Sequence, residues 1–227
     1  MTDFLARLFP DIVVRMDEFY SCTVETLIML GVVGSVSFVL SLVLAIVLVV
    51  TASGGLAPNR IVYQVLDKFI NLMRSIPFII LVTMMIPLTR FVMGTAIDLR
   101  GAIFPLIVGI TPFFVRQLES ALMGIDPGMV EASVSMGFTR WQIIWKVFLR
   151  ESISRITKVT TITLVHLLSF TAVIGVVGGG GLGDFAIRYG FQRYMFDASV
   201  AVVLVFLVFI YIIETVGKLI IASTTHG

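Results

Sequence analysis

Long stretches without formal charge alternate with short polar segments along the chain, and their lengths predict membrane crossings. A helix needs about 20 apolar residues to cross the roughly 30 Å of hydrocarbon in a bilayer. The uncharged run 26–59 predicts a first span over residues 24–50, followed by the turn-forming sequence 53–59. Four more spans are predicted at residues 65–88, 97–120, 156–177 and 197–219. All five are expected to be helices, because an open sheet edge cannot stay unpaired in lipid.

The composition supports a membrane protein. Of the 227 residues, 58% are hydrophobic and 13% are charged, whereas soluble domains carry about a quarter charged residues. The net charge of +2 gives no reason to expect a nucleic-acid partner. The single cysteine, Cys22, excludes an intrachain disulfide and a cysteine-based metal site. We therefore expect an all-α integral membrane protein without a bound metal.

The distribution of lysine and arginine predicts the orientation. If the N-terminus is outside, ten of the 16 basic residues fall in inner segments or at inner span ends. Because cytoplasmic loops are enriched in basic residues, this bias favours N-out and C-in. It places the segment of about 124–150, between spans three and four, in the cytoplasm. The ten residues are Arg60, Lys68, Arg74, Arg116, Arg140, Lys146, Arg150, Arg155, Lys158 and Lys218.

Two short helices joined at a glycine are predicted in this cytoplasmic segment. Asp126 suits an N-cap, Pro127 suits the first helical position, and Gly137 suits a left-handed C-terminal cap. Thr139 and Gln142 have the spacing of a capping box for the second helix.

Two interpretations of this hairpin remain open. It is either a solvated hairpin at the membrane surface or a helix that binds a groove on a partner protein. In the second interpretation the presented side chains are Met129, Val130, Ala132 and Met136. Ala132 and Ser133 are small enough for close approach, and Glu131 pairs with a basic residue of the groove.

The same residues resemble the cytoplasmic signature of ABC-importer permeases. Glu131, Ala132 and Ser133, then Gly137, then residues 147–149 have the matching spacing, although Ser133 replaces an alanine and Arg150 replaces a proline. Segments 74–80, 85–90, 178–183 and 189–190 look like those of methionine-uptake permeases within that superfamily. The resemblance covers about residues 65–220.

This resemblance implies a type I ABC importer in the bacterial inner membrane, with residues 1–227 as one permease domain. Two copies of the chain would form the substrate pathway, two cytoplasmic ATPases would carry ATP and Mg²⁺, and a methionine-binding lipoprotein would deliver the substrate. The residues implied to couple to the ATPase are Met129, Val130, Glu131, Ala132, Ser133, Met136 and Gly137. The sequence has no Gly-x-x-x-x-Gly-Lys-Ser/Thr phosphate loop, so we expect no ATP hydrolysis and no catalytic residue in this chain.

The fourth predicted span is the most polar and is our candidate for the pathway wall. Thr160, Thr163 and Ser169 would line it, although each hydroxyl has an ordinary alternative partner in a carbonyl of its own helix. Bulky Phe170, Val173 and Ile174 would close the outer end as a gate. His166 is expected to be packed and neutral.

Beyond this span lies a glycine run with two open interpretations. Gly178, Gly179, Gly180, Gly181 and Gly183 form either a flexible external loop or a close-packed hinge turn. The polar residues that follow, Arg188, Tyr189, Arg193 and Tyr194, either contact the lipoprotein or anchor the chain at the membrane interface.

Two further patterns predict local contacts. Ser37, Ser41 and Ala45 repeat every fourth residue, which allows close helix packing within the chain or between copies. Arg116 and Glu119 lie three apart on one predicted helix and are expected to pair.

The rival function is an ATP-independent secondary transporter or channel subunit. Such a carrier predicts internal repeats or paired broken helices, and no second copy of any segment is present. A membrane-embedded enzyme is less favoured still, because the chain has neither a His-Glu-x-x-His nor a Gly-x-Ser-x-Gly sequence.

Overall fold

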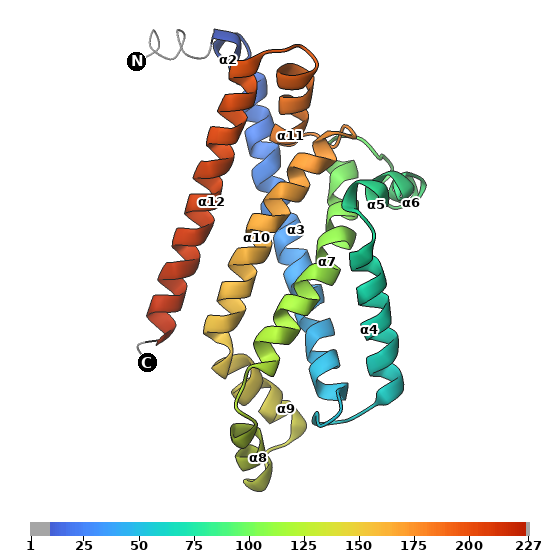
Figure 1. The fold of residues 1–227 in the computed structure, drawn as a ribbon, viewed down its shortest axis with the longest axis vertical. Coiled ribbons are helices and arrows are strands. Elements are labelled where there is room, and N and C mark those ends of the chain that lie inside the picture. Colours follow the sequence, from blue (N-terminus) through green and yellow to red (C-terminus); the bar gives the residue numbers. More distant parts are fainter. Residues whose placement is uncertain (1–9, 226–227) are drawn as a thin grey trace. The chain divides into compact units, whose positions relative to one another are not determined.

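Four apolar stretches form long helices. The computed structural model describes residues 10–225 (Figure 1). Within that range, the helices long and apolar enough to cross a membrane are α3 (Met16–Thr51), α7 (Asp98–Met123), α10 (Ile153–Gly175) and α12 (Phe196–Thr225). These correspond to the predicted first, third, fourth and fifth spans. The helix α3 starts eight residues earlier than predicted, because Asp17 and Glu18 are accommodated in its first turn.

The second predicted span, 65–88, is wrong as a single helix. It is divided among α4 (Arg60–Ser75), α5 (Phe78–Met84) and α6 (Ile86–Met93). Pro77 ends the helical run, since proline has no N–H to donate and disfavours helical geometry at the residue before it. Pro87 lies in the first turn of α6, where proline is tolerated.

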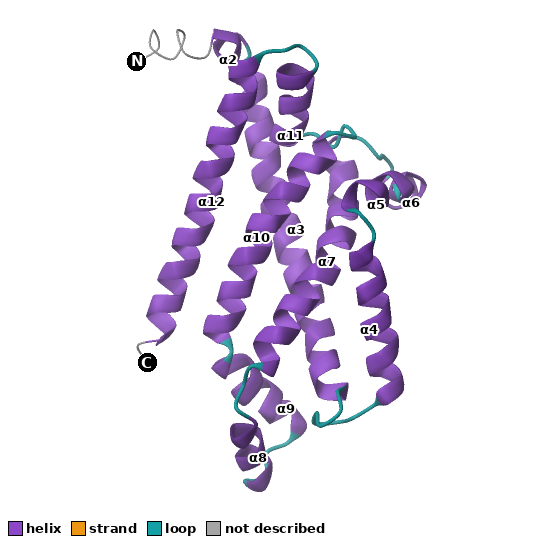
Figure 2. Cartoon of the chain, in the orientation of Figure 1, coloured by secondary structure: helices purple, strands orange, loops and turns teal. Residues whose placement is uncertain are grey.

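The remaining described elements are short helices. They are α2 (Pro10–Val14), α8 (Pro127–Ser135), α9 (Arg140–Ile143), the π-helical turn η1 (Ile144–Leu149), α11 (Gly181–Phe185) and the π-helical turn η2 (Ala186–Phe191). Figure 2 shows helices and loops and no strand over residues 10–225. The prediction of an all-α fold is confirmed for this range.

Contacts divide the chain into two compact units. Over the described residues, unit 1 comprises residues 10–36, 76–109 and 164–213, and unit 2 comprises residues 37–75, 110–163 and 214–225. The core of unit 1 contains Leu182, Phe185 and Tyr189, packed with the buried Cys22 and Ala198. The glycine run and the expected gate therefore belong to unit 1, whereas the predicted cytoplasmic segment belongs to unit 2.

The core of unit 2 joins long helices to shorter ones. One buried apolar cluster contains Leu48 of α3, Ile70 of α4, Leu118 of α7 and Phe148 of η1. Ser37, Ser41 and Ala45 are fully buried, and the Ser41 hydroxyl donates to the Thr111 carbonyl at 3.2 Å. The small-residue stripe therefore packs within the chain, which was the first of its two interpretations.

Candidate functional site

The helix α8 has the predicted local structure. The Asp126 side chain accepts a hydrogen bond from the Gly128 N–H at 2.9 Å, with Pro127 at the first helical position. After α8 the chain turns at Gly137, whose φ of +79° is in the left-handed region that favours glycine. Thr139 and Gln142 then form the predicted capping box of α9, in which the Gln142 side chain accepts from the Thr139 N–H at 2.8 Å.

The exposed face of α8 differs from the predicted one at two residues. Ser133 is 5% exposed and its hydroxyl donates to the Met129 carbonyl at 2.8 Å. Val130 packs against the core of unit 2. These two side chains hold α8 in place from inside, because they occupy its inner face. The surface residues of α8 and of its C-cap include Met129, Glu131, Ala132, Val134 and Met136.

An opening lies beside Glu131 within unit 2. A cavity of about 310 Å³ is lined by Glu131 and Val130 from the α8 side and by the turn 52–56 after α3. No local sequence pattern indicates this neighbourhood, since the two segments are far apart along the chain. The α8 surface therefore combines a projecting helix with a recess.

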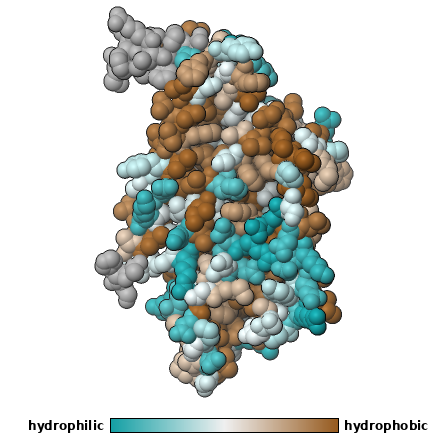
Figure 3. Space-filling model, in the orientation of Figure 1, coloured by the Kyte–Doolittle hydropathy of each residue, from teal (hydrophilic) through white to brown (hydrophobic). Residues whose placement is uncertain are grey.

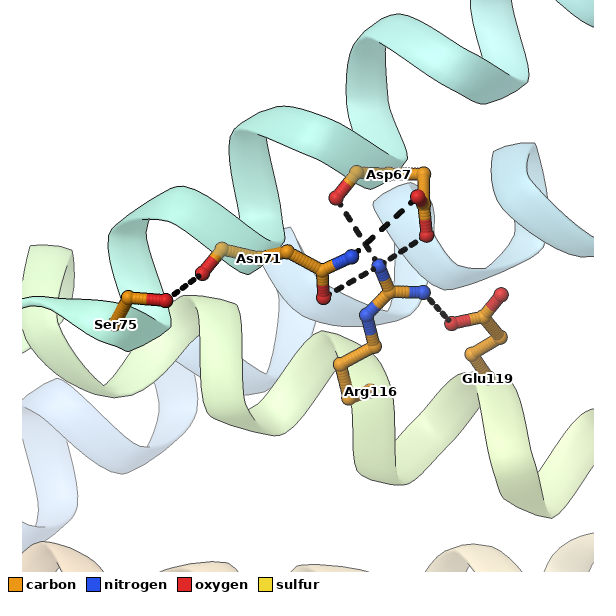
Figure 4. A network of polar contacts seen from close by, with 5 residues as sticks. All are labelled: Asp67, Asn71, Ser75, Arg116 and Glu119. Atoms are coloured by element: carbon orange, nitrogen blue, oxygen red, sulfur yellow. Dashed lines mark hydrogen bonds and ion pairs between the residues drawn. The ribbon is translucent and has the colours of Figure 1, made fainter.

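A charged network joins α4 to α7, and only half of it was predicted. Arg116 and Glu119 pair as expected, with 2.7 Å between the guanidinium and carboxylate atoms. The same guanidinium also forms an ion pair with Asp67 and donates to the Asn71 side chain at 3.0 Å (Figure 4). Figure 3 shows hydrophilic residues gathered over α4 and the adjacent part of α7. Asp67 and Asn71 were missed as partners because they are more than 40 residues away in sequence.

The polar residues of α10 are divided between buried and exposed positions. Thr163 is buried and its hydroxyl donates to the Val159 carbonyl at 2.8 Å. The buried Thr160 hydroxyl has no hydrogen-bond partner, and Ser169 is exposed. Of the predicted wall residues, Ser169 therefore has the most accessible surface.

The expected gate residues also differ in their surroundings. The Phe170 ring stacks on Phe78 with 4.0 Å between centroids and lies 4.9 Å from the His166 ring. Val173 is half-buried, whereas Ile174 is 1% exposed. Phe170 and Val173 thus retain surface for a gate, and Ile174 supports them from the interior of unit 1.

The glycine run has the close-packed form of its two interpretations. The Glu25 carboxylate accepts from the Gly181 N–H at 2.7 Å, and the Thr26 hydroxyl accepts from the Leu182 N–H at 2.9 Å. A Cβ added at Gly183 would lie 2.6 Å from the Cα of Ala172. The turn between α10 and α11 is therefore fastened to α3 and has no room for a side chain at Gly183.

This close approach makes a testable prediction. Gly183→Ala forces backbone atoms apart, which we expect to destabilise the protein by about 1–3 kcal/mol, the usual range for overpacking. Gly31→Ala is the matched control, because a Cβ there meets no atom within 4 Å and alanine favours the helix by about 0.5–1 kcal/mol. Thermal unfolding in lipid nanodiscs measures both variants. Equal unfolding temperatures for the two variants would contradict the packing described here.

Residues beyond the glycine run form an intramolecular cluster. The Arg188 guanidinium pairs with Glu18 at 2.6 Å and with Asp184 at 2.7 Å. The Tyr189 hydroxyl donates to Glu18 at 2.6 Å, and this bond, together with burial, raises the pKa of the phenol. Arg193 lies over the Tyr189 ring, 4.8 Å from its centroid. These contacts leave Tyr194, 90% exposed, as the residue of this group most available to a partner or to lipid.

No group of three or more histidine, cysteine, aspartate or glutamate side chains positioned for a metal ion occurs among the described residues.

Comparisons with known proteins identify relatives over most of the chain. Residues 45–226 match the family model described as binding-protein-dependent transport system inner membrane component. The chain is 41% identical over 210 residues to the probable D-methionine transport system permease protein MetI of Vibrio cholerae. This match covers 92% of this chain and 93% of the relative. This chain is also 46% identical over 129 residues to the D-methionine transport system permease protein MetI of Escherichia coli K12. That match covers 57% of this chain and 59% of the relative.

A solved structure supports the same relationship. A chain from inward-facing conformations of the MetNI methionine ABC transporter superposes with a TM-score of 0.90 at 38% identity. The match covers 92% of this chain and 97% of that chain. Because the family model spans most of the sequence, the chain belongs to the family of binding-protein-dependent transport system inner membrane components, which are multi-pass permease proteins of the inner membrane.

Proposed function

We propose that this chain is the permease subunit of an ATP-driven methionine importer. The observation that carries the proposal is the 41% identity to a MetI permease over nearly the whole of both chains. The backbone similarity to a chain of the MetNI methionine ABC transporter supports it independently. Whether D-methionine or other methionine derivatives pass as well depends on the binding protein that delivers them.

The proposed arrangement has five crossings with the N-terminus outside. The additional crossing lies within the segment 60–93, which holds α4, α5 and α6, because no single long helix provides it. Two copies of the chain form the pathway, since five helices enclose a poor passage alone. Residues 1–227 act as one permease domain in each copy.

The exposed face of α8 docks into a groove on the ATPase. Met129, Val134 and Met136 offer apolar contacts, and Glu131 offers a negative charge to a basic residue of the groove. Val130 and Ser133 keep the helix fixed to the core of unit 2, so that force applied to α8 reaches the long helices. ATP and Mg²⁺ are bound by the ATPase.

The substrate passes along α10 in this proposal. The exposed Ser169 offers a weak polar contact, which suits a conduit because tight binding would trap the substrate. Phe170 and Val173 close the outer end, and the glycine turn fastened by Glu25 is the hinge beyond them. A methionine-binding lipoprotein delivers the substrate at that end.

A charge reversal on α8 tests the proposed function. In Glu131→Lys, the groove loses its ionic partner and gains a repelling charge, so we expect co-purification of the ATPase to be lost together with ATP-driven methionine uptake. Asp126 is fixed in its own cap, which makes Asp126→Asn, a side chain that still caps, the matched control with normal uptake. Normal ATPase binding by Glu131→Lys would contradict the assignment of α8.

The rival function, an ATP-independent carrier or channel, is not favoured by the relatives. Proteoliposomes containing this chain without the ATPase discriminate the two functions. We expect no methionine uptake in them, and uptake without ATP would establish the carrier.

A further inference from the structure

The outward face of α9 and η1 has a composition unlike that of the neighbouring α8. Exposed and buried residues alternate in pairs, so that the pairs 143–144 and 147–148 enter the core of unit 2 while the pairs 141–142 and 145–146 face outward. The outward residues are Trp141, Gln142, Trp145, Lys146 and Arg150. The segment formed by α9 and η1, which we call the ramp, is therefore amphipathic. One of its faces is left uncovered in this chain.

Both tryptophans of the protein lie on this face. Trp141 is 71% exposed and Trp145 is 65% exposed, and they are four residues apart, so their rings project from the same side. An indole has a large apolar ring and one N–H donor, and it is enriched where an apolar phase meets water. Two such side chains left in bulk water would expose a considerable apolar area, which indicates that something covers them.

The position of the ramp along the chain indicates a lipid surface. Only residues 150–152 separate η1 from α10, whose apolar stretch is long enough to cross a membrane. At about 1.5 Å per helical residue, Trp145 lies within roughly 12 Å of the first residue of α10. That distance is within reach of the headgroup region, where tryptophan forms the aromatic belts of membrane proteins.

The outward face of α9 and η1 differs in charge from the surface of α8. The ramp carries Arg140, Lys146 and Arg150, whereas α8 contains Glu131 and has no lysine or arginine. Basic side chains next to a span are attracted by the anionic lipids of the cytoplasmic leaflet. The surface of α8 carries one acidic residue and no basic one, and therefore suits a protein groove instead. The two halves of the hairpin are therefore built for different surfaces.

We propose that the outward face of α9 and η1 binds anionic lipid headgroups, with Trp141 and Trp145 inserted at the membrane interface. The basic residues contact the phosphates, and the indoles occupy the boundary below them. This contact fixes the distance between the base of α8 and the membrane surface. The choice of the cytoplasmic leaflet rests on the orientation in the proposed function.

The two indoles report directly on this contact. The experiment uses the full chain with a tryptophan-free variant of its ATPase in vesicles of phosphatidylcholine and phosphatidylglycerol, with Trp141→Phe and Trp145→Phe each leaving one tryptophan in this chain. We expect each remaining indole to be quenched by lipids brominated near the headgroup, and much less by lipids brominated near the bilayer centre or by aqueous acrylamide.

Three results would overturn the proposal. The first is quenching by acrylamide but not by brominated lipid, which places the indoles in water. The second is brominated-lipid quenching that is absent from the complex and appears only when the chain is reconstituted without its ATPase, which makes this face a protein contact. The third is equal quenching with and without phosphatidylglycerol, which removes the role of the basic residues. We expect Arg150→Gln, which removes one of the three basic residues, to weaken the dependence on phosphatidylglycerol while the ATPase still co-purifies, so a failure here is distinguishable from a failure of the proposed function.

Discussion

Gly137→Pro is expected to abolish co-purification of the ATPase and ATP-driven uptake together. Gly137 has a φ of +79°, whereas proline fixes φ near −65°. The substitution also removes the N–H that donates to the Val134 carbonyl at 2.9 Å. Met136, which would precede the proline, has near-helical backbone angles that proline disfavours. With a penalty of about 3 kcal/mol or more for proline at an incompatible position, the joint between α8 and α9 does not form.

The matched control at the same site is Gly137→Asn. Asparagine adopts the left-handed region more readily than most residues. A Cβ at this position meets no atom within 4 Å. We expect this variant to bind the ATPase and to transport methionine. Pull-down of the ATPase and uptake in inverted and right-side-out vesicles measure both variants, and ATPase binding retained by Gly137→Pro would show that the joint is not needed.

Arg116→Met is expected to cause the largest loss of stability in the protein. The substitution leaves the carboxylates of Asp67 and Glu119 without their shared cation, and Glu119 is only 7% exposed. Removing one partner of a buried ion pair destabilises a protein by about 3–5 kcal/mol, because a desolvated charge is left uncompensated. Thermal unfolding in nanodiscs is the measurement. An unfolding temperature equal to that of the unchanged protein would show that the network contributes nothing.

Two controls separate charge from packing at this site. Arg116→Met combined with Asp67→Asn and Glu119→Gln removes the whole charge cluster, and we expect it to recover most of the lost stability. Arg188→Met breaks a comparable pair in a more exposed place, where its side chain is 40% exposed. Exposed ion pairs contribute about 0–1 kcal/mol, so this variant should change the unfolding temperature little.

Local chemistry was predictable from the sequence. The Asp126 cap, the left-handed Gly137 and the Thr139 capping box all depend on residues within a few positions of each other, and all three are confirmed. The long apolar helices were predictable for the same reason, since each depends on a continuous stretch of chain.

Features that depend on distant segments were not predictable. The Arg116 network needs Asp67 and Asn71, which only the folded chain brings together. The inner position of Ser133 and Val130 depends on the core they pack against, and that core gathers residues from several helices. The helix break at Pro77 differs from the single span predicted there, because the apolar length of the segment favours a continuous helix whereas the proline ends it.

The lone thiol of the chain has a practical consequence. Cys22 is 4% exposed, packed in the core of unit 1, so it offers little surface to a water-soluble maleimide. A cysteine introduced at an exposed position therefore becomes the main reactive group of the chain without prior engineering. Met136→Cys at the C-cap of α8 and Ser169→Cys on α10 would carry fluorophores or spin labels that report the proposed ATPase binding and substrate passage in the otherwise native molecule.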